Sequence, residues 1–236
     1  MLFPYKDDNP TERPAVVTVG LIVLNAAVFL YCWLQGEGGF TRSVFELGVI
    51  PKELWSGNLP QSRGHFPPVS LFTSMFMHAG WLHLIGNMLY LWIFGNNVED
   101  YLGHFRFIVF YVACGLIASF SHIAFNLGSK VPMVGASGAI AGVLGAYLVL
   151  YPRARVHVFL FLFIFITTFT VPAWLVLGLW FVLQIINSLP EFSGSSGGGV
   201  AYLAHVGGFV AGLVYLRHRV GKTRRRRTKS YRGSFR

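Results

Sequence analysis

Long apolar segments constrain this chain more than any other feature of its sequence. Residues 16–34 form a run of 19 residues without a charged side chain. A helix of that length crosses a hydrocarbon core of about 30 Å. Only 12% of the residues are charged and 54% are hydrophobic, whereas an average soluble domain has about 25% charged residues. The sequence therefore predicts an all-α membrane protein.

Six apolar segments are predicted to cross the membrane as helices. They are residues 16–34, 81–94, 105–127, 137–151, 171–189 and 200–216. The polar segment 95–100 is expected to end the second helix, and residues 35–80 are expected to form a long, partly embedded first outer loop. The apolar segment 156–170 is only 15 residues long and is followed by Pro172, so we do not count it as a crossing.

The basic residues are concentrated at the C-terminal end of the chain. Residues 217–236 hold ten of the nineteen Lys and Arg residues, and the other nine are balanced by nine Asp and Glu residues. Because cytoplasmic segments are enriched in Lys and Arg, six crossings with both termini in the cytoplasm match this distribution best. We expect a short N-terminus at 1–15, a membrane domain at 16–216 and a basic tail at 217–236. Such a tail is typical of contact with anionic lipid headgroups rather than with nucleic acid.

Four polar side chains are expected at one depth in the membrane, roughly 18–24 Å from the inner surface at 1.5 Å per residue. They are Ser137, His205, His83 and Asn87. A neutral histidine that accepts a proton from a serine is the general-base arrangement for attack on a carbonyl group. The His83 and Asn87 side chains and the Ser137 backbone N–H are hydrogen-bond donors, which predicts an oxyanion hole. Because the acidic residues are all expected in termini or loops, a Ser-His dyad is favoured over a Ser-His-Asp triad.

Small residues predict how the helices that carry Ser137 and His205 meet. One stripe is formed by Ser137, Ala141 and Gly145, and the other by His205, Gly208 and Gly212. Such stripes let two helices approach closely in lipid. If the two stripes face each other, the hydroxyl and the imidazole come within hydrogen-bond distance. The alternative is that the glycines serve packing alone and that Ser137 bonds a carbonyl of its own helix.

Two other polar residues, His78 and Gln184, are expected to have structural roles. His78 is expected to brace the loop that precedes the second helix, and Gln184 is expected to pack or to lie at the membrane interface. A metal site formed by His78, His83 and His205 is the competing interpretation. It is disfavoured because the membrane region offers no carboxylate, no paired cysteines and no HExxH motif. We therefore expect neither a metal nor a cofactor.

The polar motifs resemble those of the rhomboid family of intramembrane serine proteases. They are His78, His83 and Asn87; Gly135-Ala136-Ser137-Gly138; and Ala204-His205-Val206-Gly207-Gly208 with Gly212. The resemblance covers residues 16–216 and implies a six-helix bundle that cleaves single-pass or multi-pass membrane proteins near the outer leaflet. It implies Ser137 as nucleophile, His205 as general base, and His83, Asn87 and the Ser137 amide as oxyanion donors. It also implies that Gly135 contacts the substrate.

Two positions depart from the family's pattern. A Trp-Arg pair that often precedes the helix-two motif corresponds here to Val69-Ser70, and a Tyr that stacks on the catalytic histidine corresponds to Ala141. Neither change removes a reacting group, so we expect a protease. The short, ungapped architecture suggests a prokaryotic plasma membrane. One alternative is an inert rhomboid-like protein that binds transmembrane helices for quality control. A transporter is disfavoured because paired repeats and mid-membrane acids are not seen in the sequence.

Overall fold

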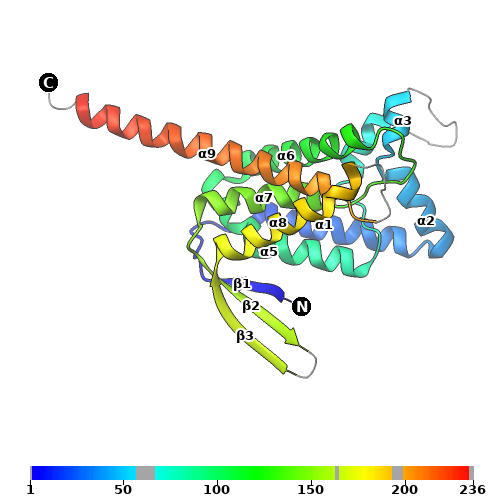
Figure 1. Cartoon of the computed structure of the whole chain (residues 1–236), viewed down its shortest axis with the longest axis horizontal. Helices are drawn as coiled ribbons and strands as arrows, with labels where there is room; N and C mark the ends of the chain where they lie inside the picture. Colours follow the sequence, from blue (N-terminus) through cyan, green and yellow to red (C-terminus); the bar gives the residue numbers. More distant parts are fainter. Residues whose placement is uncertain (1, 57–66, 163–164, 193–198, 234–236) are drawn as a thin grey trace.

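Helices make up most of the molecule, and a small β-sheet projects from one end of them (Figure 1). The computed structural model describes residues 2–56, 67–162, 165–192 and 199–233. The long helices are α1 (Val16–Trp33), α5 (Trp81–Leu102), α6 (His104–Phe125), α7 (Ser137–Leu150), α8 (Ala173–Phe192) and α9 (Tyr202–Gly233). The shorter helices are α2 (Gly36–Leu47), α3 (Pro51–Ser56), η1 (Pro67–Val69) and α4 (Ser70–Thr73). The strands are β1 (Leu2–Asp7), β2 (Arg155–Leu162) and β3 (Phe165–Pro172).

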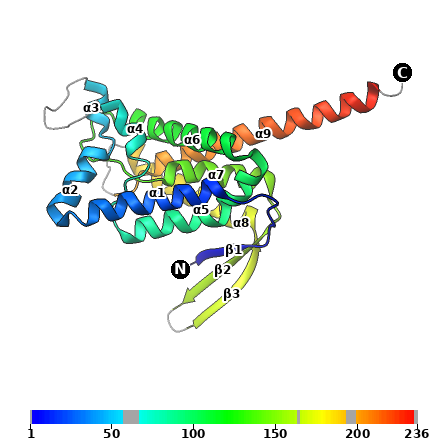
Figure 2. The same ribbon diagram turned by 180° about the vertical axis from the view of Figure 1, so that it is seen from behind.

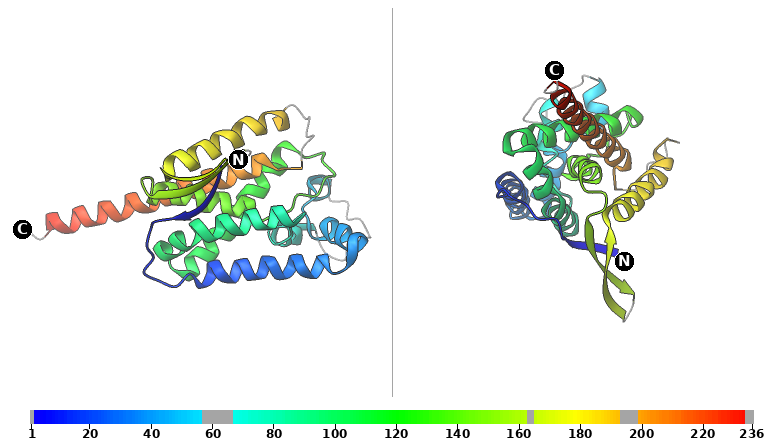
Figure 3. Two further views of the ribbon diagram at one scale, coloured as in Figure 1. Left: turned by 90° about the horizontal axis from the view of Figure 1, so that it is seen from below. Right: turned by 90° about the vertical axis from the view of Figure 1, so that its left-hand side faces the viewer.

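The six long helices run side by side, with α7 at the centre of the bundle (Figures 2 and 3). Every residue of α7 from Gly138 to Tyr147 is buried. The surrounding helices carry exposed large apolar side chains, for example Val23, Leu82, Phe105 and Leu189. Within the described part of the chain, three helices are long and apolar enough to cross a membrane, namely Val16–Trp33, His104–Phe125 and Ala173–Glu191, and α7 is a shorter apolar helix. This apolar exterior is that of a membrane protein.

Most of the predicted helices match the observed ones closely. Helices α1, α6, α7 and α8 begin and end within three residues of their predicted bounds. The prediction that residues 95–100 end the second helix is wrong, because α5 continues to Leu102. The polar side chains in this segment have partners that the sequence does not show, so they do not interrupt the helix.

Glu99 is one of the buried polar residues of this segment, and it joins α5 to two other helices. Its carboxylate accepts hydrogen bonds from the backbone N–H groups of Val17 and Thr18 at 2.8 and 2.7 Å, and from the Thr18 hydroxyl at 2.6 Å. The His104 ring, at the start of α6, lies 2.6 Å from the same carboxylate. Glu99 therefore satisfies the unpaired N–H groups at the start of α1, where a negative charge is also favoured.

The fold is mostly helical, as predicted, but it is not all-α, because it also contains a three-stranded antiparallel sheet in the order β1-β2-β3. The segment 156–170 alternates along a strand rather than following a helical period, so that Val156 and Val158 are buried against the bundle while Phe159 is exposed. Residues 2–7, which we expected to be only a polar terminus, pair with β2. We call the end of the bundle next to the sheet the sheet end.

The sheet is tied to the sheet end by polar contacts. The Asp7 carboxylate accepts hydrogen bonds from the Tyr147 hydroxyl of α7 at 2.5 Å and from the Asn97 amide of α5 at 3.0 Å. At the start of α8, Ala173 N–H donates to the Ala154 carbonyl and Trp174 N–H to the Pro152 carbonyl, both at 2.9 Å. The end of α7, the start of α8 and the strands are therefore joined in one unit.

Two further predicted segments differ from the structure. The sixth helix was expected to end at residue 216, but α9 continues as one helix to Gly233 and carries much of the basic segment (Figure 1). The described residues of the first loop are largely helical and form α2, α3, η1 and α4. Residues 57–66 of that loop and residues 234–236 of the basic tail lie outside the described residues.

Glycines bring α7 and α9 into direct backbone contact. A Cβ atom added to Gly208 or Gly212 would collide with the backbone of Gly138 or Gly142, respectively. A Cβ atom at Gly145 would collide with the backbone of α9 at Phe209. The stripe on α9 is the predicted one, but the stripe on α7 is Gly138, Gly142 and Gly145 rather than one that contains Ser137 and Ala141. Ser137 is consequently left at the edge of the contact, with its side chain free to face a neighbour.

Replacing Gly212 with alanine is expected to destabilise the bundle by about 1–3 kcal/mol, the usual cost of overfilling a packed interface. The added methyl group meets backbone atoms of Gly142, which move only if α7 and α9 separate. Thermal unfolding in detergent measures the effect. Gly178→Ala in α8 is the matched control, because a Cβ atom there has no neighbour within 4 Å. Equal melting temperatures for the two variants would contradict this account of the interface.

Candidate functional site

Ser137 and His205 meet at the end of the bundle opposite the sheet. Ser137 is the first residue of α7, and His205 lies in the first turn of α9. The glycine contact between these helices brings the two side chains together, and His205 Nε2 is 2.8 Å from Ser137 Oγ. The hydroxyl therefore bonds a residue of another helix rather than a carbonyl of its own. This pair has the geometry of a nucleophile and its general base.

Gln184 of α8 contacts the other nitrogen of the same ring, which the sequence analysis missed. His205 Nδ1 lies 2.8 Å from Gln184 Oε1. The Trp180 ring, one turn earlier in α8, lies beside the imidazole with a centroid distance of 5.9 Å and an interplanar angle of 33°. The signal that could have identified Gln184 is its amide group within an apolar helix, because polar groups at membrane depth need partners.

A cavity of about 760 Å³ opens beside this pair. It is lined by residues of α5, α7, α8 and α9, and all four predicted polar residues, Ser137, His205, His83 and Asn87, belong to its lining. Asn87 is 8% exposed, and its side-chain Nδ2 has no acceptor among the described residues. An unpaired buried N–H group beside a nucleophile is a donor that is available to a developing negative charge.

Gly135 supports His83 in the structure. Its φ angle is +129°, a conformation that favours glycine. A Cβ atom at this position would lie 2.8 Å from His83 Cε1 and Nε2, and the Gly135 N–H donates to the Ser74 carbonyl at 2.8 Å. The missing side chain thus leaves room for the His83 ring beside Ser137. A contact between Gly135 and a substrate stays a prediction.

His78 lies behind His83, away from the lining of the cavity. Its side chain is fully buried, and its ring packs edge-on against His83 with a centroid distance of 5.1 Å. Burial, together with the neighbouring His83 ring, lowers the pKa of His78 from 6.5 to about 4. His78 is therefore neutral at pH 7 and acts as packing support for His83. Among the described residues, no group of three or more His, Cys, Asp or Glu side chains is placed to bind a metal ion.

The expectation that all acidic residues lie in termini or loops is wrong. Glu99 lies within α5, and Glu191 lies in the last turn of α8. In the described structure neither of them contacts His205, whose Nδ1 partner is the uncharged amide of Gln184. These two acidic residues accordingly do not complete a triad with Ser137 and His205.

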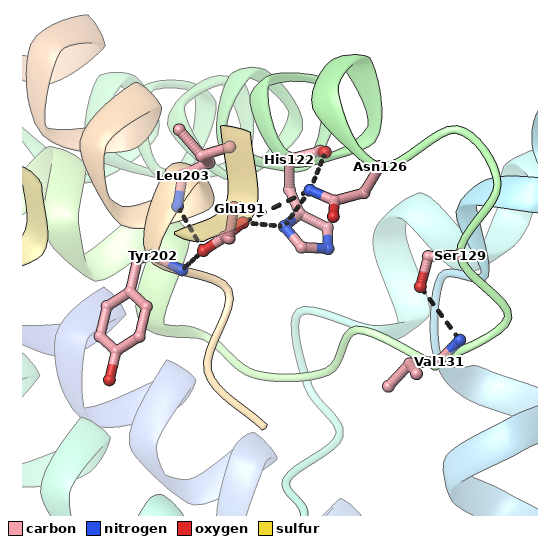
Figure 4. Close-up of polar contacts among 7 residues, drawn as sticks. All are labelled: His122, Asn126, Ser129, Val131, Glu191, Tyr202 and Leu203. Carbon is pink, nitrogen blue, oxygen red and sulfur yellow. Dashed lines mark hydrogen bonds and ion pairs between the residues drawn. The ribbon is translucent and has the colours of Figure 1, made fainter. Parts of the chain in front are cut away.

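Glu191 connects α8 to α6 and α9 (Figure 4). Its carboxylate accepts hydrogen bonds from the backbone N–H of Tyr202 at 2.8 Å and of Leu203 at 3.4 Å. The other oxygen lies 3.2 Å from His122 Nδ1 and 3.4 Å from Asn126 Nδ2. Glu191 thus caps the start of α9 one turn before His205 and fixes the end of α8 against both neighbours.

Comparison with known proteins gives a consistent result. A family model for the Rhomboid domain matches residues 66–220. The chain is 31% identical over 204 residues to Rhomboid protein 1, mitochondrial, of Saccharomyces cerevisiae, which covers 81% of this chain and 55% of that protein. It is 36% identical over 134 residues to Rhomboid protease GluP of Bacillus subtilis, which covers 57% of this chain and 25% of that protein. It is 27% identical over 225 residues to RHOMBOID-like protein 12, mitochondrial, of Arabidopsis thaliana, at 88% and 60% coverage. The chain thus spans less than two thirds of the length of each of these relatives.

Proposed function

Because the chain belongs to the rhomboid family, we propose that it is an intramembrane serine endopeptidase that cleaves transmembrane segments of membrane-protein substrates. The observation that carries this proposal is the 2.8 Å contact between Ser137 Oγ and His205 Nε2. The contact lies beside a cavity that also contains the unpaired Asn87 Nδ2 donor. A serine paired with a base, next to a donor for an oxyanion, is what this chemistry requires. The same contact disfavours the inert rhomboid-like alternative, because binding a helix does not require a nucleophile paired with a base.

In the proposed reaction Ser137 Oγ attacks the carbonyl carbon of the scissile peptide bond, while His205 Nε2 takes the hydroxyl proton. The tetrahedral intermediate then breaks its C–N bond, and His205 returns the proton to the leaving amine. Water attacks the resulting acyl ester with His205 again as the base, which releases a carboxyl group and restores the Ser137 hydroxyl. The products are the two halves of the substrate chain, formed with the consumption of one water molecule.

The negative charge of the tetrahedral intermediate is expected to meet three donors. These are Asn87 Nδ2, which has no other acceptor among the described residues, the His83 ring and the Ser137 backbone N–H. The Ser137 N–H lies in the first turn of α7, where N–H groups have no partner within the helix and where the positive end of the helix dipole lies. Donors that are held in place before the reaction give strong electrostatic stabilisation.

The membrane arrangement that fits this proposal has six crossings, formed by α1 and α5–α9, with the sheet end on the cytoplasmic side. Both described chain ends then lie in the cytoplasm, and the basic residues of α9 meet anionic headgroups. Ser137 lies toward the outer leaflet. The comparisons do not support the predicted prokaryotic plasma membrane, because two of the relatives named above are mitochondrial proteins.

The proposed substrates are single-pass or multi-pass membrane proteins whose transmembrane helix unwinds near the cavity. A helical peptide bond is shielded, and its hydrogen bonds are not replaced by lipid. Segments with Gly, Pro or other small residues near the cleavage point are therefore preferred. No cofactor is required for this chemistry.

Covalent labelling tests the proposed function. The purified protein in detergent should react with a fluorophosphonate probe, and the adduct should map to the peptide that contains Ser137. The reaction requires a serine that is activated by a base, so denatured protein is the control and should remain unlabelled. Absence of labelling in folded protein, or an adduct on another residue, would remove the basis for the protease assignment and favour the inert, helix-binding alternative.

A further inference from the structure

We propose that Gln184 is a positioning residue that holds the His205 imidazole in the tautomer and orientation required for catalysis. This inference rests on the proposed protease function and extends it to a third residue and to helix α8. The contact that suggests it is the 2.8 Å distance between His205 Nδ1 and Gln184 Oε1. Together with the Ser137 contact at Nε2, it gives each ring nitrogen one partner.

The orientation of the Gln184 amide follows from its second hydrogen bond. Gln184 Nε2 donates to the Trp180 carbonyl of its own helix at 3.2 Å. A backbone carbonyl accepts but does not donate, so the NH₂ group faces Trp180 and the amide oxygen faces His205. The amide oxygen is likewise only an acceptor. His205 Nδ1 must therefore carry the hydrogen.

A neutral imidazole with its hydrogen on Nδ1 has an unprotonated Nε2, which is the nitrogen that faces Ser137 Oγ. The Ser137 hydroxyl then donates to Nε2, as general-base catalysis requires. The opposite tautomer would leave Nδ1 and the amide oxygen as two facing acceptors. Gln184 thus disfavours the unreactive tautomer by direct electrostatic repulsion, and it favours the imidazolium formed in the reaction because that ion donates from both nitrogens.

The position of Gln184 is itself fixed by the packing of α8. The residue is 8% exposed, and its neighbour in space, Trp180, covers one side of the imidazole. Seven residues further along α8, Glu191 holds the helix to the start of α9 through the Tyr202 and Leu203 N–H groups (Figure 4). Residues seven positions apart lie on nearly the same face of a helix. Gln184 and Glu191 therefore form two polar attachments of α8 to the first turn of α9, one at His205 and one at Tyr202 and Leu203.

Gln184→Met removes the acceptor and keeps the length and approximate volume of the side chain. The expected result is a fall in kcat of about tenfold with KM unchanged, which corresponds to one neutral hydrogen bond that acts mainly in the transition state. The rate of labelling by a small fluorophosphonate should fall by a similar factor. Gln184→Glu keeps an acceptor oxygen and should restore both rates to within about threefold of those of the unmodified protein.

The labelling rate with the small fluorophosphonate distinguishes a positioning role of Gln184 from a purely structural role in α8. A substitution that only disturbed the docking of a transmembrane substrate on α8 would change KM and leave the labelling rate unchanged. Leu183→Met is the matched control, because Leu183 is the adjacent residue and is 46% exposed on the outside of the bundle. Its rates should equal those of the unmodified protein. Rates are compared per folded molecule, and Gln184→Leu replaces the methionine variant if that variant does not fold.

The outcomes distinguish this inference from the function on which it rests. If the unmodified protein is not labelled at Ser137, the protease assignment fails. If it is labelled, but Gln184→Met reacts at the same rate, Gln184 is not a positioning residue while the protease assignment stands. Folded Gln184→Glu that reacts as slowly as Gln184→Met would also overturn the inference, because an acceptor at this position would then have no effect.

Discussion

Replacing Ser137 with alanine is expected to lower the rate of cleavage of a transmembrane substrate by at least about 10⁴-fold. The substitution removes the oxygen that forms the acyl ester, and His205 Nε2 loses its partner at 2.8 Å. The fold should be retained, because Ser137 lies at the edge of the α7–α9 contact, which is formed by glycines such as Gly142 and Gly212. Cleavage of a single-pass substrate in reconstituted vesicles measures the rate.

Ser121→Ala is the matched control for this prediction. Ser121 also lies in an apolar helix, but its hydroxyl donates to the Ile117 carbonyl of the same helix at 2.8 Å. Its removal should leave cleavage nearly unchanged. If Ser137→Ala and Ser121→Ala both cleave the substrate at the rate of the unmodified protein, the nucleophile is a different group and the proposed mechanism is wrong.

Replacing Glu99 with alanine is expected to destabilise the protein by about 3 kcal/mol or more. The Glu99 side chain is 1% exposed, and its carboxylate accepts three hydrogen bonds from Val17 and Thr18 at the start of α1. Without it, these buried donors have no acceptor, and each such group costs roughly 1–3 kcal/mol. Thermal or denaturant-induced unfolding in detergent measures the loss.

The adjacent residue Asp100 provides the control. It accepts hydrogen bonds from the backbone N–H groups of Glu12 and Arg13 at 3.1 and 3.0 Å, in contacts that are exposed to solvent. Water replaces an exposed acceptor, so Asp100→Ala should cost less than about 1 kcal/mol. A loss for Asp100→Ala as large as that for Glu99→Ala would show that burial of the Glu99 carboxylate is not the cause.

The sequence predicted the parts of the fold and site that follow from helical periodicity. Counting residues along apolar helices placed Ser137 and His205 at one depth, and their side chains are 2.8 Å apart in the structure. Glycines 208 and 212 on α9 face α7 as their spacing predicted. Both results depend on the regular rise and turn of a helix, which a sequence specifies well.

The predictions that were wrong or incomplete have a common cause. Polar and strand-forming segments depend on partners that are distant in the chain. Residues 95–100 look like a helix end, but Glu99 has its partners in α1, 81 residues or more away in sequence. The segment 156–170 is too short to span and becomes strands because residues 2–7 add a third strand to its hairpin. Gln184 was assigned to packing because nothing along α8 indicates that its amide meets a ring 21 residues later.

Helix α8 is attached at the sheet end, so a tilt of this helix would be a rotation about Ala173. The hydrogen bonds of Ala173 and Trp174 to the Ala154 and Pro152 carbonyls restrict sliding along the axis. A displacement of the other end is therefore a rotation, and it requires the Glu191 contacts with α9 to loosen. At 1.5 Å per residue along α8, Gln184 is roughly 16 Å and Glu191 roughly 27 Å from Ala173. A swing that moves the Glu191 end by about 2 Å then moves Gln184 by about 1 Å, enough to break a hydrogen bond to His205. A small tilt of this one helix would therefore be enough to break the contact between Gln184 and the reacting imidazole of His205.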